Sequence, residues 1–476
     1  MPDHRAASPP VAVRSAVGCG RHSERSVSAL SPAVTASAPR GLHWFGGERP
    51  MWPALSIAVL VSFSETVPAA WLTGMNAYLV GLAAVLAIAA GRAFDEALIR
   101  VLVPFGGLLL LGGVSGIGSD SWDFLRDFWY VGNAALTFAA GYVLYCANPN
   151  VRYGLRATVM AGSVVGVLQI APFIADPALI TYSSTQIRSA IGTGFFVPAL
   201  GLIVLSAFVG RCSDELGIHP VFAAAAAGLM TAAIILSFSR TILLVAVVGA
   251  VVGFGFLDRR VVSRSILMSL LGLIALSLLG VMIDAETPSG QHSFIGKLAR
   301  SLQELWVADY ADFKSINENW RGYETARALL QYASGSPLEW LIGQGFGVMI
   351  DLGVAIELGG SRGIGLILYR EIPILHNGYA YLLVKCGLLG VAAFFAFLVL
   401  LYRSARTVST ANWPATGVSA SRLMRAIVVS LLATTWVISG PFNKSELFGF
   451  MLVAGFTYAH LVRAHWGILT GVRGRA

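Results

Sequence analysis

The chain has 476 residues, of which 56% are hydrophobic and only 12% are charged, and its mean hydropathy is +0.71. A soluble globular protein carries roughly twice this share of charged residues, so the composition excludes a cytosolic enzyme, a nucleic-acid reader and a secreted disulfide scaffold. The formal net charge of +8 does not indicate nucleic-acid binding, because most Lys and Arg residues lie between long apolar runs. The composition therefore indicates a protein that spans a lipid bilayer.

The cysteines and the N-terminal segment carry no sign of a metal site or of secretion. Cys19, Cys146, Cys212 and Cys386 form no Cys-x-x-Cys pair and have no histidine at metal-ligand spacing, so we expect no disulfide framework, no metal and no cofactor. Residues 1–50 are rich in Ala, Ser, Pro and Arg and lack an apolar run, which favours a disordered cytoplasmic tail over a signal peptide. Because Met51 directly precedes the first apolar run, translation from that position is an open alternative.

Apolar runs long enough to cross a bilayer divide the rest of the chain. A helix crosses the hydrocarbon core with about 20 mostly apolar residues. Twelve segments meet this requirement: 51–67, 70–91, 98–118, 128–146, 153–174, 190–210, 218–237, 240–257, 264–283, 376–402, 423–440 and 446–463. We therefore predict an all-α polytopic membrane protein, with nine spans in 51–283, a long loop at 284–375, three spans in 376–463 and a tail at 464–476.

The distribution of Lys and Arg predicts the orientation, because these residues are enriched in cytoplasmic loops. With a cytoplasmic N-terminus, 21 of the 33 Lys and Arg residues fall on the cytoplasmic side, five lie near the opposite face and seven belong to the long loop. This orientation predicts that both termini are cytoplasmic and that the loop 284–375 lies on the exterior, periplasmic side.

The loop 284–375 is too long for a passive connection and holds 11 of the 25 acidic residues, so we expect it to cap an active site. Two helical patterns occur in it, at Phe294, Leu298, Leu302 and Leu305 and at Trp320, Tyr323, Ala326 and Leu330. They predict short amphipathic helices on or near the membrane surface.

Four polar residues near the predicted periplasmic face are candidates for chemistry. Arg188 precedes the sixth span and Arg240 lies at the turn of an apolar hairpin. Arg321 lies on a predicted loop helix, and His376 stands where the loop re-enters the membrane. An arginine can bind a diphosphate through two charge-assisted hydrogen bonds, and a histidine can take a proton from a hydroxyl. Each also has a simpler interpretation: anchoring at the lipid interface for Arg188 and Arg240, a solvated helix face for Arg321, and a structural role for His376.

Two further groups have alternative interpretations. Asp120, Asp123 and Asp127 follow the third span; we interpret them as part of a solvated loop, with catalytic acids as the alternative. The three glycines in 343–347 either form a flexible turn between loop helices or let the backbone bend closely around a bulky ligand.

Three stretches between Trp320 and Gly390 form an ordered set. They are Trp320-Arg321-Gly-Tyr, the stretch Pro337–Gly347, and the stretch His376–Gly390, which begins His-Asn-Gly-Tyr. In order and spacing they resemble the C-terminal signature of the bacterial O-antigen ligase and O-antigen polymerase superfamily. The Arg188 loop, the Ser-Arg pair at 239–240 and the layout of twelve spans with a long loop after the ninth are similar to that family too, and the resemblance covers residues 180–400.

The resemblance implies a GT-C-like glycosyltransferase whose donor is a glycan on undecaprenyl diphosphate. Its acceptor would be a sugar hydroxyl of lipid A core or of a growing polysaccharide. Arg188, Arg240 and Arg321 would bind the departing diphosphate, and His376 would activate or orient the acceptor hydroxyl. Preorganised cations stabilise the charge that develops on a leaving phosphate, so arginines can replace a metal, and the chain has no Asp-x-Asp motif.

Two alternatives stay open. A repeat-unit polymerase of O-antigen or exopolysaccharide, in the same superfamily, uses the same donor chemistry and differs only in its acceptor. A secondary transporter is the alternative of another class, because twelve spans are common among transporters. Transporters bind substrate near the bilayer midplane through polar residues inside the spans, whereas here the polar residues gather in one predicted exterior loop.

Overall fold

The computed structural model describes residues 95–181, 196–237, 239–256, 319–357, 368–408, 415–442 and 447–469, with single positions at 81, 187, 191 and 316. The predicted tail 1–50, the spans 51–67, 70–91 and 264–283, and the helical pattern from Phe294 to Leu305 lie outside the described residues. All elements discussed below belong to one compact unit, Gly41–Ala476.

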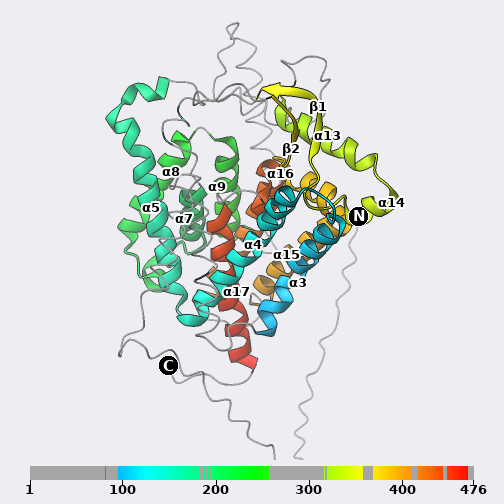
Figure 1. The fold of residues 1–476 in the computed structure, drawn as a ribbon. Coiled ribbons are helices and arrows are strands. Elements are labelled where there is room, and N and C mark those ends of the chain that lie inside the picture. Colours follow the sequence, from blue (N-terminus) through cyan, green and yellow to red (C-terminus); the bar gives the residue numbers. More distant parts are fainter. Residues whose placement is uncertain are drawn as a thin grey trace, which may run out of the picture. The chain divides into compact units, whose positions relative to one another are not determined.

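The described chain is mostly helical (Figure 1). Its long helices are α3 (Glu96–Ser115), α4 (Ser121–Ala147), α5 (Val151–Ala175), α7 (Phe196–Ala207), α8 (Pro220–Leu236), α9 (Arg240–Gly253), α15 (Gly378–Val408), α16 (Ala415–Ile438) and α17 (Phe448–Leu469). Short helical turns occur at Pro177–Thr181, Cys212–Leu216 and Gly440–Phe442. Each long helix overlaps one predicted span, and α17 continues to Leu469, beyond the predicted end at residue 463.

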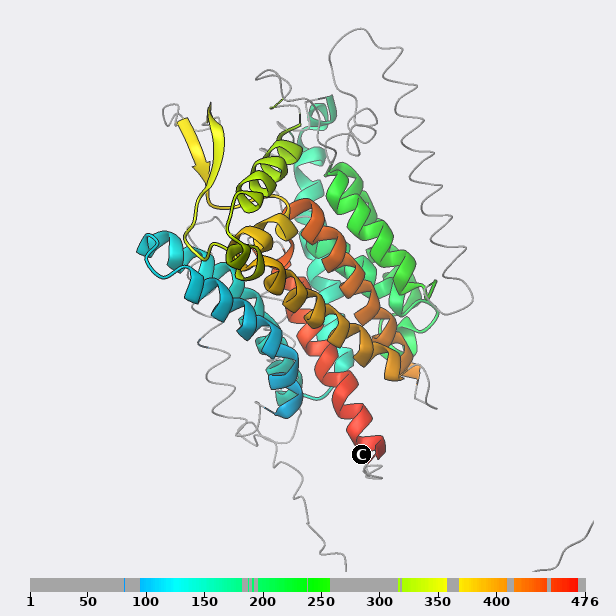
Figure 2. The ribbon, with the colours of Figure 1, turned by 90° about the vertical axis from the view of Figure 1, so that its right-hand side faces the viewer.

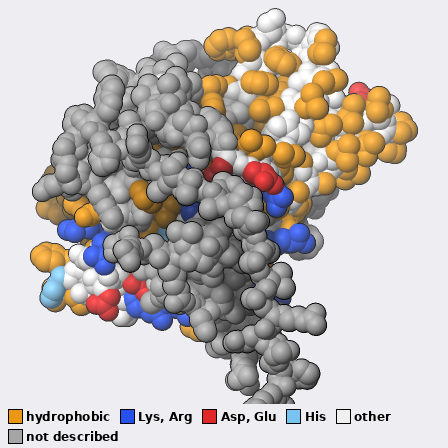
Figure 3. All heavy atoms as spheres, turned by 90° about the horizontal axis from the view of Figure 1, so that it is seen from below, with side chains coloured by type: hydrophobic (Ala, Val, Ile, Leu, Met, Phe, Trp, Pro, Cys, Tyr) orange, Lys and Arg blue, Asp and Glu red, His pale blue; other side chains and the backbone are white. Residues whose placement is uncertain are grey.

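Several of these helices suit a bilayer. Four are long and apolar enough to cross one: α3, α5, Gly378–Arg406 of α15 and Thr416–Ile438 of α16. The helices α7, α8 and α9 and the segment Phe448–Arg463 of α17 are shorter and also apolar. One side of the molecule presents almost only hydrophobic side chains, whereas Lys, Arg, Asp and Glu gather elsewhere in that view (Figure 3). The prediction of a helical membrane protein is supported, and length and composition support a crossing at four of the described helices.

The helices pack against neighbours in the sequence and also against helices that are distant in the sequence (Figures 1 and 2). Helix α4 packs against α17, α5 against α7, α9 against α16, and α15 against both α3 and α16. The crossing of α4 and α17 is close because Gly141 and Gly455 each face backbone of the other helix, where a Cβ would clash. Small residues at such crossings allow the tight packing on which helix association in lipid depends.

Helix α15 is interrupted near its start, although the sequence predicts one uninterrupted span at 376–402. Gly387 has φ 66° and ψ −166°, so the helix consists of two segments on either side of it. The backbone of Leu341 and Gly343 occupies the space that a Cβ at residue 387 would need. A left-handed φ and a neighbouring chain both require glycine at this position.

Residues 319–357 and 368–372 form a cap at one end of the helices. Its elements are α13 (Trp320–Ala333), α14 (Pro337–Ile342) and the strands β1 (Ile350–Glu357) and β2 (Leu368–Ile372). Helix α13 confirms the spacing predicted from Trp320 to Leu330. The antiparallel β1–β2 hairpin corrects the prediction of a purely helical loop. Alternating apolar residues at 350, 352, 354 and 356 are the period-two signal of a strand. We call the end of the bundle beneath the cap, where α3 ends and α4 and α15 begin, the cap end.

Candidate functional site

Helix α13 carries a carboxylate into the interior of the cap. Its buried face consists of Gly322, Tyr323, Glu324 and Ala328. The Tyr323 hydroxyl donates a hydrogen bond to the Leu352 carbonyl of β1, which fixes the helix against the hairpin, and burial raises the pKa of this phenol. The Glu324 side chain, only 4% exposed, is thereby held in a fixed position.

His376 lies directly against Glu324. Its Nδ1 is 2.8 Å from Glu324 Oε2, and its backbone N–H donates to the same oxygen at 3.2 Å. The imidazole is 35% exposed, whereas the carboxylate is almost completely buried. Ser439, which follows α16, donates from its hydroxyl to the Leu375 carbonyl and from its backbone N–H to the His376 carbonyl. The histidine is thus held by the cap from one side and by α16 from the other.

This geometry selects the role that each atom of the pair can have. When Nδ1–H donates to the carboxylate, Nε2 keeps a lone pair and can accept a proton. A buried carboxylate behind a histidine also stabilises the imidazolium that forms when the proton arrives. The His376–Glu324 pair therefore has the arrangement that a general base requires, and nothing in the sequence pattern pointed to Glu324.

Two of the predicted arginines can be placed relative to this pair. Arg321 precedes Glu324 by three residues on α13, a spacing that puts two side chains on one face of a helix, and it is half-buried. Arg240 is the first residue of α9, at the positive end of the helix dipole, and is also half-buried. Helix α9 packs against α16, the helix whose end holds His376 through Ser439. Arg188 lies outside the described residues.

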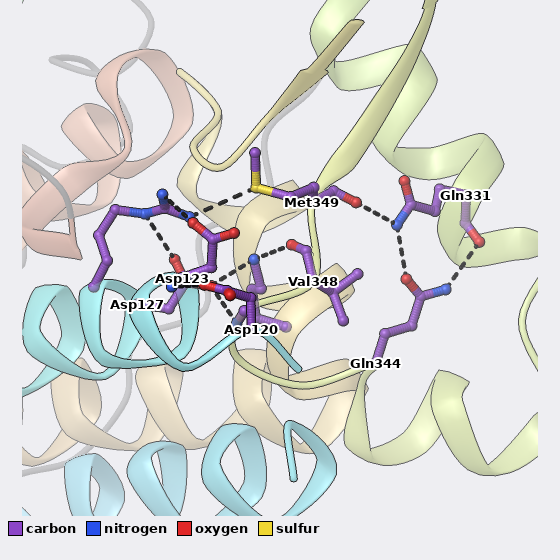
Figure 4. Close-up of polar contacts among 10 residues, drawn as sticks. Asp120, Asp123, Asp127, Gln331, Gln344, Val348 and Met349 are labelled. Atoms are coloured by element: carbon purple, nitrogen blue, oxygen red, sulfur yellow. Dashed lines mark hydrogen bonds and ion pairs between the residues drawn. The ribbon is translucent and has the colours of Figure 1, made fainter. Parts of the chain in front are cut away.

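A second polar group, fully buried, joins α4 to α15 at the cap end (Figure 4). Lys385 Nζ is 2.6 Å from Asp127 Oδ2, and both side chains are completely buried. The same carboxylate oxygen accepts the Gly347 N–H at 2.8 Å, and the ammonium also donates to the Val348 carbonyl. Burial of two charges is tolerated because each finds an opposite charge and a backbone partner.

The structure shows where the three acidic residues at the start of α4 lie. Asp120 is exposed and is the N-cap of α4, where its side chain accepts from the N–H groups of Trp122 and Asp123. Asp123 pairs with Arg126 at 2.5 Å, and Asp127 lies in the buried ion pair. The solvated-loop interpretation is therefore wrong for Asp127, which is completely buried, whereas Asp120 is exposed, as that interpretation expects.

Residues 343–349, which we call the glycine strap, join four helices. Gln344 N–H donates to Val384 O at 2.7 Å and Gly345 N–H to Lys385 O at 3.1 Å, both on α15. Phe346 N–H donates to Gly112 O of α3 at 2.8 Å, and the Gly347 N–H reaches Asp127 of α4. The fourth helix is α13, through the side chain of Gln331, which donates to Gln344 Oε1 at 2.8 Å and to Met349 O at 3.1 Å (Figure 4).

The conformation and close packing of the glycine strap require glycine at three positions. Gly343, Gly345 and Gly347 have φ values of 82°, 99° and 87°. A Cβ on Gly343 would meet the backbone of Lys385 and Cys386, one on Gly345 would meet the backbone at the end of α3, and one on Gly347 would lie 2.6 Å from Ser119 Cβ. The glycines bring the chain close to its own helices, so both earlier interpretations, a flexible turn and a bend around a ligand, are replaced by close packing.

The hairpin adds an exposed ionic group on the outside of the cap. Asp351 has Arg327 at 3.6 Å and Arg370 at 3.6 Å. The Gly353 N–H donates to the carboxylate at 2.8 Å, and this bond, followed by the two arginines, lowers the pKa of Asp351. The group holds β1, β2 and α13 together.

Comparison with known proteins adds no identification: neither protein-family models nor curated proteins give a match to this chain. Within the described ranges, no three His, Cys, Asp or Glu side chains are grouped in a way that could hold a metal ion.

Proposed function

We propose that this protein is a membrane glycosyltransferase of the O-antigen ligase type, which transfers a glycan from undecaprenyl diphosphate to a sugar hydroxyl. The observation that carries the proposal is the His376–Glu324 pair, which lies at the cap end with Arg321 one helical turn away on α13. The sequence resemblance assigns Arg321 to the diphosphate and His376 to the acceptor. Both residues belong to the segments that meet around Glu324, which supports that assignment.

The proposed reaction uses these groups in one displacement. The acceptor hydroxyl oxygen attacks the anomeric carbon of the donor sugar while His376 Nε2 takes the hydroxyl proton, and Glu324 stabilises the resulting imidazolium. The bond between the anomeric carbon and the phosphate oxygen breaks, and undecaprenyl diphosphate leaves with the electron pair. Arg321, together with Arg240 and Arg188, would bind the charge that develops on this leaving group.

The test is the envelope glycan profile of a clean deletion in the native host, complemented with variants of equal membrane abundance. A ligase deletion leaves long chains on undecaprenyl diphosphate and bare lipid A core. His376→Ala and Arg321→Ala should fail to restore the profile, whereas Arg370→Ala, on the outside of the hairpin and 72% exposed, should restore it.

Other outcomes separate the alternatives. Single repeat units on core, or the loss of a secreted polymer, would identify the polymerase of the same superfamily. Full complementation by His376→Ala would overturn the assignment of the general base. An unchanged profile in the deletion would favour the secondary transporter instead.

A further inference from the structure

The short helix α14 differs from the rest of the cap in its surface. None of its residues is buried. Its exposed side chains include Leu338 at 63%, Trp340 at 42% and Leu341 at 45%, and Glu339 is its only charged residue. Positions 338 and 341 are three residues apart, so they lie on one face of the helix. An apolar face of this kind on a surface helix needs a partner of matching chemistry.

The position of α14 identifies that partner. The helix packs against α15 and α3, and the Ser115 hydroxyl at the end of α3 donates to the Ile342 carbonyl at 3.5 Å. The Leu341 backbone lies directly against Gly387, and the next two residues of α15, Leu388 and Leu389, are 55% and 43% exposed. Those leucines belong to a helix that can cross a membrane. The apolar face of α14 is therefore continuous with a lipid-facing surface.

The backbone of α14 also suits a medium without water. A helix leaves its last four carbonyls without partners inside the helix, and such groups are costly in lipid. Here the Gly343 N–H donates to Glu339 O at 2.8 Å and the Tyr332 hydroxyl donates to Trp340 O at 2.5 Å, while Ile342 O is bonded to Ser115 as described. At the other end, Ser336 and Glu339 form a capping box. Groups of the protein thus bond three of the last four carbonyls of α14, those of residues 339, 340 and 342, and the capping box bonds its start.

We propose that α14 inserts into the membrane leaflet on the cap side, with Leu338 and Leu341 among the acyl chains and Trp340 at the level of the headgroups. Tryptophan and tyrosine prefer this level, and Tyr332 is bonded to Trp340 there. Glu339, whose carboxylate accepts the Ser336 N–H at 2.6 Å, marks the edge of α14 that faces headgroups and water.

The insertion has a structural consequence for the candidate site. Helix α14 leads directly into the glycine strap, which is bonded to α15 and, through Gln331, to α13. A membrane-inserted α14 therefore fixes the height of the whole cap, and it holds the His376–Glu324 pair close to the headgroups. This inference does not depend on the reaction that the pair performs.

Nitroxide accessibility in proteoliposomes tests the proposal. The full chain, with its native cysteines replaced by alanine, receives a spin label at Leu338→Cys or, separately, at Leu341→Cys. Arg370→Cys on the hairpin is the control for water, and Val399→Cys, 45% exposed on α15, is the control for lipid. Relaxation by oxygen, which concentrates in lipid, is compared with relaxation by a water-soluble nickel chelate.

We expect both labels on α14 to behave like the label at residue 399, with strong relaxation by oxygen and loss of relaxation by nickel. Nickel relaxation as strong as at residue 370 would overturn the proposal. Exclusion of both reagents, with broadening between labels, would also overturn it, because a second copy of the chain would then cover the face. Leu338 is the decisive position, since its exposed side chain makes its replacement harmless to folding; a thermal transition equal to that of the unlabelled chain verifies this.

Discussion

The buried ion pair between α4 and α15 allows a sharp test of how the cap end is stabilised. In Lys385→Met, the Asp127 carboxylate loses the ammonium at 2.6 Å; it keeps the Gly347 N–H and the more distant Arg126 guanidinium, whose Nε lies 3.9 Å away. At an effective dielectric constant of 20, the attraction across this distance is about 6 kcal/mol, and desolvation of both charges offsets part of it. Removal of one partner from a buried pair costs about 3–5 kcal/mol, because the other charge stays buried. We expect the free energy of unfolding to fall by that amount.

The assay is reversible unfolding in mixed detergent micelles, followed by circular dichroism. The matched control is Arg100→Met, which breaks the exposed Arg100–Glu96 pair, 70% and 79% exposed; its loss should stay below about 1 kcal/mol. The double variant Asp127→Asn/Lys385→Met should recover most of the loss, since no buried charge remains and the amide still accepts from Gly347. Equal losses in Lys385→Met and Arg100→Met, or a double variant less stable than either single one, would refute the reasoning.

Three further predictions concern the cap. Glu324→Gln should lower turnover in the glycan assay by less than the about 10²- to 10⁴-fold expected for His376→Ala, because an amide oxygen still accepts from Nδ1; equal losses would mean that the carboxylate charge is essential. Gly345→Ala should destabilise the chain by at least about 1–3 kcal/mol from its left-handed backbone alone, whereas Gly113→Ala, in open space on α3, should be neutral or slightly stabilising in the same unfolding assay. Asp351 has a pKa below its ordinary value of 3.8, so it contributes stability that is complete above that value and is lost as the pH falls through the lowered pKa. The Tm difference between Asp351→Asn and the parent should accordingly be largest at pH 7 and vanish in acid; a difference that persists there would contradict the assignment.

Sequence periodicity predicted the helices well because their pattern is set by the solvent. Long apolar runs have few alternatives to a helix in lipid, so every described helix of the bundle overlaps a predicted span. The cap was predicted less well, because its elements are short and their pattern is weak. The spacing from Trp320 predicted α13. The alternation from Ile350 to Ile356 forms a strand, although the loop was predicted to be helical.

In the candidate site, too, some residues could be predicted from the sequence and others could not. His376, Arg321 and Arg240 stood out because charge and imidazole are rare near apolar spans. Glu324 did not stand out, since an acid in a polar loop is ordinary until the fold buries it. Asp127 and Lys385 were each visible as a charge beside or within an apolar span, a placement that already suggests a partner. Their pairing depends on a contact across 258 residues, which no local pattern encodes.

The separation of 258 residues between Asp127 and Lys385 delays the formation of their ion pair during synthesis of the chain. Chains are made at about 5–20 residues per second, so roughly 13 to 52 s pass between the synthesis of Asp127 and that of Lys385. During this interval α4 has entered the membrane with a carboxylate whose ammonium partner does not yet exist. The acid must stay hydrated or protonated, and the start of α4 must remain accessible to water, until α15 arrives and the strap can close over both. The contact between α4 and α15 at the cap end is therefore completed long after α4 is made, and of the described long helices only α16 and α17 follow α15 in the chain.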